Sequence, residues 1–170
     1  MKRTISLDGN QLTINDIKNL NSDVIVEISP NAKEKMIKAN DFIKEIVESG
    51  NAVYGINTGF GALADKRINK NDLSKLQYNL IRSHCTGVGE FFSEEITRAI
   101  MLIRANCLCS GFSGINPELV ELLIGFINSG ITQNVLLICA DAHSINLDKN
   151  LLPVVGDGLS CILITRKKNT

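Results

Sequence analysis

The residues best suited to chemistry lie in a glycine-rich stretch at 53–61, which reads Val-Tyr-Gly-Ile-Asn-Thr-Gly-Phe-Gly. Its three glycines permit tight turns and let a ligand approach the backbone closely. Tyr54, Asn57 and Thr58 bring a phenol, a carboxamide and a hydroxyl into the same segment. The stretch therefore predicts either a loop that contacts a ligand or a compact structural loop.

The same glycines raise the question of phosphate binding, since Gly59–Ala64 matches the pattern G-x-G-x-x-A. That pattern binds dinucleotides when a strand precedes it and an apolar helix follows it within a β-α-β unit. Here the charged run Asp65-Lys66-Arg67 interrupts the position of that helix, and no such unit surrounds the motif. The context argues against a nucleotide-binding module.

Two other groups of residues carry reactive types without the spacing that their chemistry needs. Asp141, His143 and Ser160 are the residue types of a catalytic triad, but no nucleophile elbow accompanies them. Cys107 and Cys109 are two residues apart on a helical pattern, so they face different directions and make a poor metal pair. We therefore predict no metal site.

Four ordered blocks resemble the aromatic amino-acid ammonia-lyases, over about residues 1–132. The first block is the stretch 53–61, which is similar to the signature loop of that family. The others are 77–89, which contains Asn-Leu-Ile-Arg-Ser-His-Cys-Thr-Gly-Val-Gly, then 104–114, and finally 122–131. The resemblance implies that 1–132 is the N-terminal part of an ammonia-lyase-like domain, and that 133–170 is a divergent tail of unknown structure.

This family removes ammonia across the α and β carbons of an amino acid, and the resemblance assigns roles to four residues. Tyr54 corresponds to the base that takes the β proton; an ordinary tyrosine titrates near pH ~10, so donors must stabilise its phenolate. Asn57 either holds the loop or contacts the substrate. Ser83 and His84 form a pair that resembles the histidine-specific branch, because both can hydrogen-bond an imidazole. The implied reaction converts L-histidine into urocanate and ammonia.

Without the resemblance, the same residues have ordinary structural interpretations. Tyr54 alone would be a buried core tyrosine whose hydroxyl has a hydrogen-bond partner. His84 alone would be a residue of the core or of a helix end. The surrounding blocks favour the catalytic and substrate-binding interpretations.

The electrophile of the family is a methylidene-imidazolone ring that forms from an Ala-Ser-Gly triplet, and the 170 residues contain no such triplet. Counting from Gly130, the triplet should fall at 143–145, where the sequence has His143-Ser144-Ile145. Glycine is needed because a side chain crowds the ring closure, and isoleucine is β-branched. We therefore expect no imidazolone group, no bound cofactor and no activity of this chain alone. The alternative is a truncated or frame-disrupted, non-catalytic product that at most associates with a full-length partner.

The elements that must position these residues are mainly helical. We predict an N-terminal β-hairpin with strands at 4–7 and 11–14, followed by a short helix that begins at a capping box of Thr13 and Asp16. A strand at 24–28 comes next. Four helices are predicted at about 30–49, 71–85, 93–110 and 116–129, with a loop at 51–69 and apolar runs at 135–140 and 162–164. The predicted fold class is mainly α, and the resemblance implies a truncated form of the ammonia-lyase helical fold.

Composition narrows the classes of partner and the cellular location. Lys plus Arg and Asp plus Glu are 18 each, so the basic excess of a nucleic-acid binder is missing. No apolar run reaches the length of a membrane span, and the N-terminus lacks a signal-peptide pattern. Five cysteines, an odd number, favour free thiols in the cytoplasm. We expect a small-molecule amino acid as the partner, and the family resemblance implies a homotetramer and hence self-association.

Overall fold

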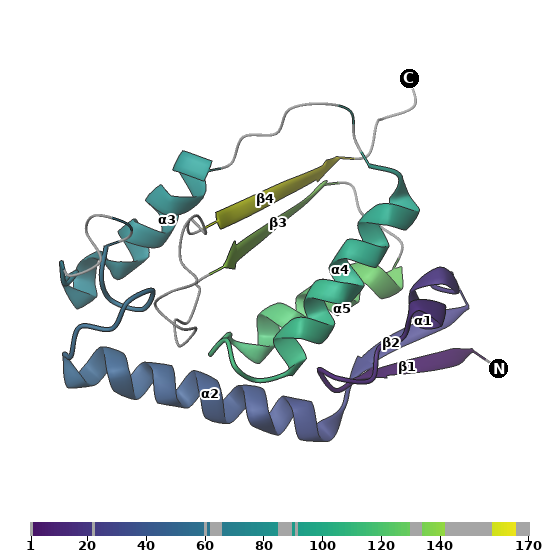
Figure 1. Ribbon diagram of the computed structural model, residues 1–170, viewed down its shortest axis with the longest axis horizontal. Coiled ribbons are helices and arrows are strands. Elements are labelled where there is room, and N and C mark those ends of the chain that lie inside the picture. Colours follow the sequence, from purple (N-terminus) through teal and green to yellow (C-terminus); the bar gives the residue numbers. More distant parts are fainter. Residues whose placement is uncertain are drawn as a thin grey trace, which may run out of the picture. The chain divides into compact units, whose positions relative to one another are not determined.

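The chain forms two compact units. Figure 1 labels their helices and strands. The computed structural model describes residues 2–21, 23–59, 61, 66–84, 90, 92–129, 134–141 and 158–165; for residues 77, 80, 81 and 84 and for the last two ranges it describes the backbone alone. One unit combines residues 1–49, 90–134 and 164–170, and the other combines residues 50–89 and 135–163. The glycine-rich loop and the Ser83-His84 pair fall in the second unit.

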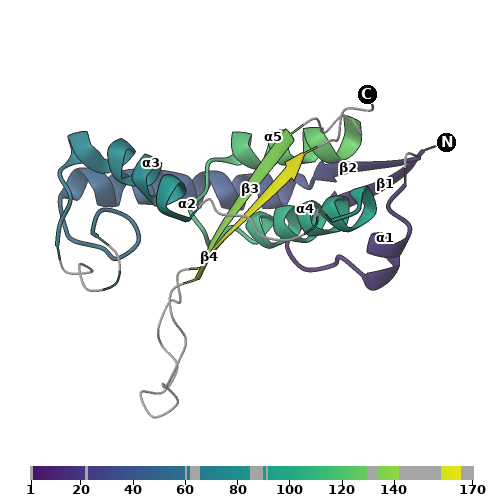
Figure 2. The same ribbon diagram turned by 90° about the horizontal axis from the view of Figure 1, so that it is seen from above.

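The first unit begins with two short parallel strands. β1 (Arg3–Leu7) pairs with β2 (Val24–Ile28), with Ile5 opposite Val26, and the strands lie side by side in Figure 1 and Figure 2. The connection between them carries α1 (Ile14–Lys18), because parallel strands need a crossover rather than a tight turn. The sheet contributes four side chains to the core, namely Ile5, Leu7, Val24 and Val26.

The predicted N-terminal β-hairpin is wrong in its pairing, although its first strand and its turn are present. The Asp8 carboxylate accepts hydrogen bonds of 2.8 Å from the backbone N–H groups of Asn10 and Gln11, and Gly9 has a φ of 88°. After this turn, residues 11–13 lie in neither a strand nor a helix, and Thr13 caps α1, which begins at Ile14. The capping box is a stronger local signal than the polar-apolar alternation, so β1 pairs with the β-branched strand β2.

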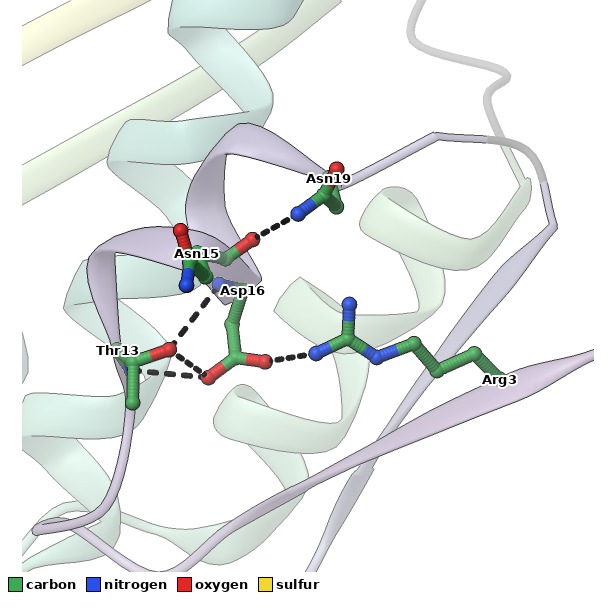
Figure 3. A network of polar contacts seen from close by, with 5 residues as sticks. All are labelled: Arg3, Thr13, Asn15, Asp16 and Asn19. Carbon is green, nitrogen blue, oxygen red and sulfur yellow. Dashed lines mark hydrogen bonds and ion pairs between the residues drawn. The ribbon is translucent and has the colours of Figure 1, made fainter.

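A capping box begins α1, which confirms the prediction from Thr13 and Asp16 (Figure 3). The Thr13 hydroxyl accepts a hydrogen bond of 3.2 Å from the Asp16 N–H, and the Asp16 carboxylate accepts one of 2.9 Å from the Thr13 N–H. Arg3 of β1 forms an ion pair with the same carboxylate. The Thr13 hydrogen bonds, and after them the Arg3 charge, hold the pKa of Asp16 below its ordinary value.

Helices form the bulk of the first unit, within limits close to those predicted. They are α2 (Pro30–Ser49), α4 (Glu94–Cys109) and α5 (Pro117–Ser129), which pack on one another. Ser93, the predicted first residue of this helix, caps α4 by accepting a hydrogen bond of 3.4 Å from the Ile96 N–H. Their packing buries large apolar side chains almost completely, among them Met36, Met101, Leu102, Val120 and Ile127.

Asn128, near the end of α5, joins this helix to the N-terminal sheet. Its side-chain oxygen accepts a hydrogen bond of 2.8 Å from the Val26 N–H, and its side-chain nitrogen donates one of 2.8 Å to the Val26 carbonyl oxygen. Both main-chain groups of a buried strand residue are thereby paired with one side chain. The carboxamide thus acts toward β2 as a neighbouring strand would.

The second unit contains η2 (Lys70–Asp72), α3 (Leu73–His84) and most of a two-stranded sheet of β3 (Asn134–Asp141) and β4 (Gly158–Thr165). The apolar run at 135–140 is therefore part of a strand. No helix among the described residues is long and apolar enough to cross a membrane. The described chain is mainly helical with small sheets, which confirms the predicted fold class.

Candidate functional site

The loop after α2 carries Tyr54 in a tight turn. The carbonyl oxygen of Val53 accepts hydrogen bonds from the N–H groups of Ile56, at 3.1 Å, and Asn57, at 3.2 Å. Tyr54 and Gly55 are therefore the central residues of the turn, and Gly55 has a φ of 77°. This left-handed backbone favours glycine, because a β-carbon would crowd the neighbouring carbonyl group. The glycine next to Tyr54 is thus required by the turn that carries the phenol.

Asn57 holds this turn with its side chain. Its Oδ1 accepts a hydrogen bond of 2.8 Å from the Val53 N–H, and its Nδ2 donates one of 2.7 Å to the Asn51 carbonyl oxygen. We call these two hydrogen bonds the Asn57 clasp. The main chain of Asn57 is also fixed, since its carbonyl oxygen accepts a hydrogen bond of 2.8 Å from the Ile68 N–H. The residue is only 2% exposed, so its carboxamide is shielded from water.

The far end of the loop is fixed by a short antiparallel pairing. Thr58, 1% exposed, forms an isolated β-bridge with Arg67, and the Gly59 N–H donates a hydrogen bond of 2.9 Å to the Lys66 carbonyl oxygen. At the near end, a β-carbon added to Gly50 would lie 2.8 Å from a guanidinium nitrogen of Arg67. Both ends of the loop therefore lie against the same segment.

The four predicted site residues lie in the same compact unit. Tyr54 is half-buried in the turn, and Asn57 is buried with its carboxamide directed at the backbone of its own loop. Ser83 lies exposed in the last turn of α3, and His84 is the last residue of that helix, with a side chain outside the described residues. Of the two roles offered for Asn57, the geometry favours holding the loop.

The electrostatics of the described residues do not add a second reactive centre. Burial, together with the Asp8 carboxylate, raises the pKa of the Cys109 thiol to about 11. That thiol is protonated at neutral pH and is therefore a poor nucleophile and a poor metal ligand. Within the described ranges, no group of three or more His, Cys, Asp or Glu side chains could hold a metal ion.

Sequence reasoning missed the partners that make the loop rigid, Asn51 and Val53. They act through a carbonyl oxygen and an N–H group, and every non-proline residue has both. The only available signal was Asn57 itself, because asparagine in a glycine-rich loop often hydrogen-bonds to nearby backbone. That signal indicates a local bond without identifying its partners.

Comparison with known proteins identifies the family. Residues 12–137 match the family described as aromatic amino acid lyase. Histidine ammonia-lyase of Staphylococcus saprophyticus is 46% identical over 129 residues, which are 75% of this chain and 26% of that protein. The crystal structure of histidine ammonia-lyase from Trypanosoma cruzi superposes with a TM-score of 0.68 at 38% identity, over 74% of this chain and 25% of that one.

A neighbour with a different substrate shows the same fold. The ergothionase from Treponema denticola, an ergothioneine-degrading enzyme, superposes with a TM-score of 0.70 at 33% identity, over 75% of this chain and 26% of that one. The chain thus spans about a quarter of the length of these relatives. The family match covers the Tyr54 loop, α3, α4 and α5. The chain therefore belongs to the aromatic amino acid lyase family.

Proposed function

We propose that this chain supplies the N-terminal part of a histidine ammonia-lyase active site. In this proposal the phenolate of Tyr54 takes a proton from the β carbon of L-histidine, and the products are urocanate and ammonia. The observation that carries the proposal is the glycine-dependent turn at Tyr54, within a chain 46% identical over 129 residues to a histidine ammonia-lyase. Such a base must be held within hydrogen-bond reach of the proton that it removes.

The electrophilic group of the family does not fit these 170 residues. The group forms from Ala-Ser-Gly, and no such triplet is present. The nearest counterpart, His143-Ser144-Ile145, lies outside the described residues and has isoleucine where the ring closure needs glycine. This chain alone should therefore lack activity, and in a complemented lyase another segment would have to supply the electrophile.

We assign substrate selection to Ser83 and His84. Their position at the end of α3, in the same unit as the Tyr54 loop, supports this role. Ser83 is exposed rather than packed in a core, which suits a hydroxyl that contacts a ligand. A polar pair that hydrogen-bonds an imidazole discriminates against amino acids that lack one, because the pair would be left without partners.

A chimeric lyase tests this function directly. Residues 12–137 of this chain replace the corresponding segment of the Staphylococcus saprophyticus relative, and we call this protein the chimera. We expect the chimera to release ammonia and urocanate from L-histidine faster than ammonia from L-tyrosine or L-phenylalanine, and the 170-residue chain alone to release neither. A folded chimera without activity on L-histidine would refute the site assignment. Turnover by the chain alone would refute the requirement for Ala-Ser-Gly.

A second candidate function, association with a lyase partner, is favoured by exposed apolar side chains on α4 and α5. Ile96 and Ile103 of α4 are 49% and 44% exposed, and Leu119 and Leu122 of α5 are each 55% exposed. Each pair follows helical spacing, while the opposite face of the same helix is buried in the first unit. A helix that is apolar on two faces is typical of the interior of a larger assembly.

We propose that these faces are covered in a homotetramer or by a lyase partner in the cytoplasm, a location that the odd number of cysteines supports. Size-exclusion chromatography with light scattering measures the assembly. We expect the chain alone to elute as a species larger than a monomer, and the variant Ile103→Glu with Leu122→Glu to reduce that mass. The matched control is Lys38→Glu, at an exposed position of α2, and it should leave the measured mass unchanged. A monodisperse monomer of the unsubstituted chain would refute self-association.

A further inference from the structure

We propose that Asn57 is a positioning residue for Tyr54: the Asn57 clasp fixes the turn on which the phenol is carried, and its carboxamide does not contact the substrate. This inference rests on the proposed function for the role of Tyr54, but the clasp itself rests on the structure. The side chain bonds to residues on the N-terminal side of Tyr54, at Asn51 and Val53. Asn57 follows the turn, so the clasp closes a small ring of chain around Tyr54.

The clasp needs the donor and the acceptor of an asparagine side chain. Oδ1 accepts the hydrogen bond from the Val53 N–H at 2.8 Å, while Nδ2 donates to the Asn51 carbonyl oxygen at 2.7 Å. An aspartate keeps the acceptor and loses the donor, and an alanine loses both. A glutamine has both groups one methylene further along its side chain, so they would not reach these two partners without a shift of the loop. The chemistry of the site therefore selects asparagine among the polar residues.

Burial argues against direct contact between Asn57 and a substrate. The residue is 2% exposed, and both ends of its carboxamide are already hydrogen-bonded within the loop. Its N–H donates to the Val53 carbonyl oxygen, and its own carbonyl oxygen accepts from Ile68. A substrate would have to break these bonds to reach the side chain, and each broken bond would leave a backbone group of the loop without its partner.

The consequence for catalysis is geometric. A base acts only while its oxygen lies within hydrogen-bond reach of the proton, and small displacements of such a group reduce turnover steeply. The clasp removes freedom from the backbone on both sides of Tyr54, so the phenol spends more time in one orientation. Loss of the clasp should therefore lower kcat, while substrate affinity, which Ser83 and His84 supply in the proposed site, should change little.

Amide hydrogen exchange at Val53 in the full 170-residue chain tests the clasp without any activity. Asn57→Ala should accelerate exchange of the Val53 N–H about tenfold or more, because it removes the acceptor of that group. Asn57→Asp keeps the acceptor and should leave this exchange within about threefold of the unsubstituted chain. The matched control is Asn31→Ala at an exposed position of α2, and the amides of Tyr78 and Asn79 in α3, which lies in the same unit as the loop, report on folding.

Comparing the exchange rates of the Val53 N–H in the two variants separates the hydrogen-bonding role of the clasp from a packing role. If Asn57 only filled space, the buried charge of the aspartate would open the loop at least as much as alanine does. Equal acceleration in both variants, or unchanged exchange in Asn57→Ala, would overturn the inference. Slow exchange in Asn57→Asp with fast exchange in Asn57→Ala would support it, provided that the α3 amides keep their protection in both proteins.

The chimera then tests the catalytic consequence. Asn57→Ala in the chimera should lower kcat on L-histidine by about tenfold or more and leave KM within about threefold. A raised KM with unchanged kcat would show substrate contact and overturn the positioning role. If the unsubstituted chimera is inactive, the proposed function fails, and exchange at Val53 still decides whether the clasp exists.

Discussion

Truncation of Asn128 to alanine should destabilise the first unit, because its carboxamide hydrogen-bonds to both the N–H and the carbonyl oxygen of Val26. The two hydrogen bonds are each 2.8 Å long, and Val26 is 2% exposed. Leaving a buried donor or acceptor without a partner costs about 1–3 kcal/mol, so the upper bound for the pair is about 6 kcal/mol. Since Asn128 itself is exposed, water reaches part of the vacated space, and we expect about 2–3 kcal/mol.

Urea unfolding of the full chain, followed by far-ultraviolet circular dichroism, measures this loss. The control is Asn31→Ala in α2, an exposed asparagine for which the structure records no side-chain hydrogen bond among the described residues. It corrects for the intrinsic gain in helix propensity when asparagine becomes alanine. A difference between the two variants below about 0.5 kcal/mol would show that the Asn128 hydrogen bonds do not hold α5 to β2.

Three further outcomes are expected. In the chimera, Tyr54→Phe should lower kcat on L-histidine by about 10²-fold or more with KM within a few-fold, since only the base hydroxyl is lost; near-normal turnover would remove Tyr54 from the mechanism. Ser83→Phe with His84→Leu should weaken kcat/KM for histidine more than for phenylalanine, and an unchanged ratio would make the pair structural. The pKa of Asp16 lies below its ordinary value of 3.8, chiefly because of the hydrogen bond to the Thr13 side chain. The charged carboxylate therefore stabilises the fold fully at pH values above 3.8, and this contribution is lost as pH falls through the lowered pKa. Asp16→Asn should therefore flatten the fall in Tm below about pH 4, and an equally steep fall would refute this linkage.

Helix limits in this chain could be predicted because their signals are local. Ser93 caps α4 and Pro117 opens α5 at the expected positions, and the capping box of Thr13 and Asp16 is present. Each of these signals is satisfied by groups within three residues along the chain. No information about tertiary structure is needed to read them.

Strand pairing and side-chain exposure depend on distant parts of the chain, and the sequence predicted them poorly. β1 pairs with β2 across a crossover, whereas the alternation at 4–14 indicated a hairpin. Phe42 and Met36 are both apolar residues of α2, yet Phe42 is 61% exposed and Met36 is 1% exposed. The apolar pattern identifies the helix, but the number of helices packed on it decides which apolar residues are buried.

In the candidate site, too, one feature depends on residues close in the sequence and another does not. Hydrogen bonds among residues 51–68 hold the Tyr54 turn, so the backbone that carries the proposed base is fixed within a single segment. The electrophile, by contrast, requires an Ala-Ser-Gly triplet that these 170 residues do not contain. Preorganisation of the proposed base therefore does not depend on completion of the site. Exchange at Val53 and turnover by the chimera measure these two properties separately, so either one can fail while the other holds.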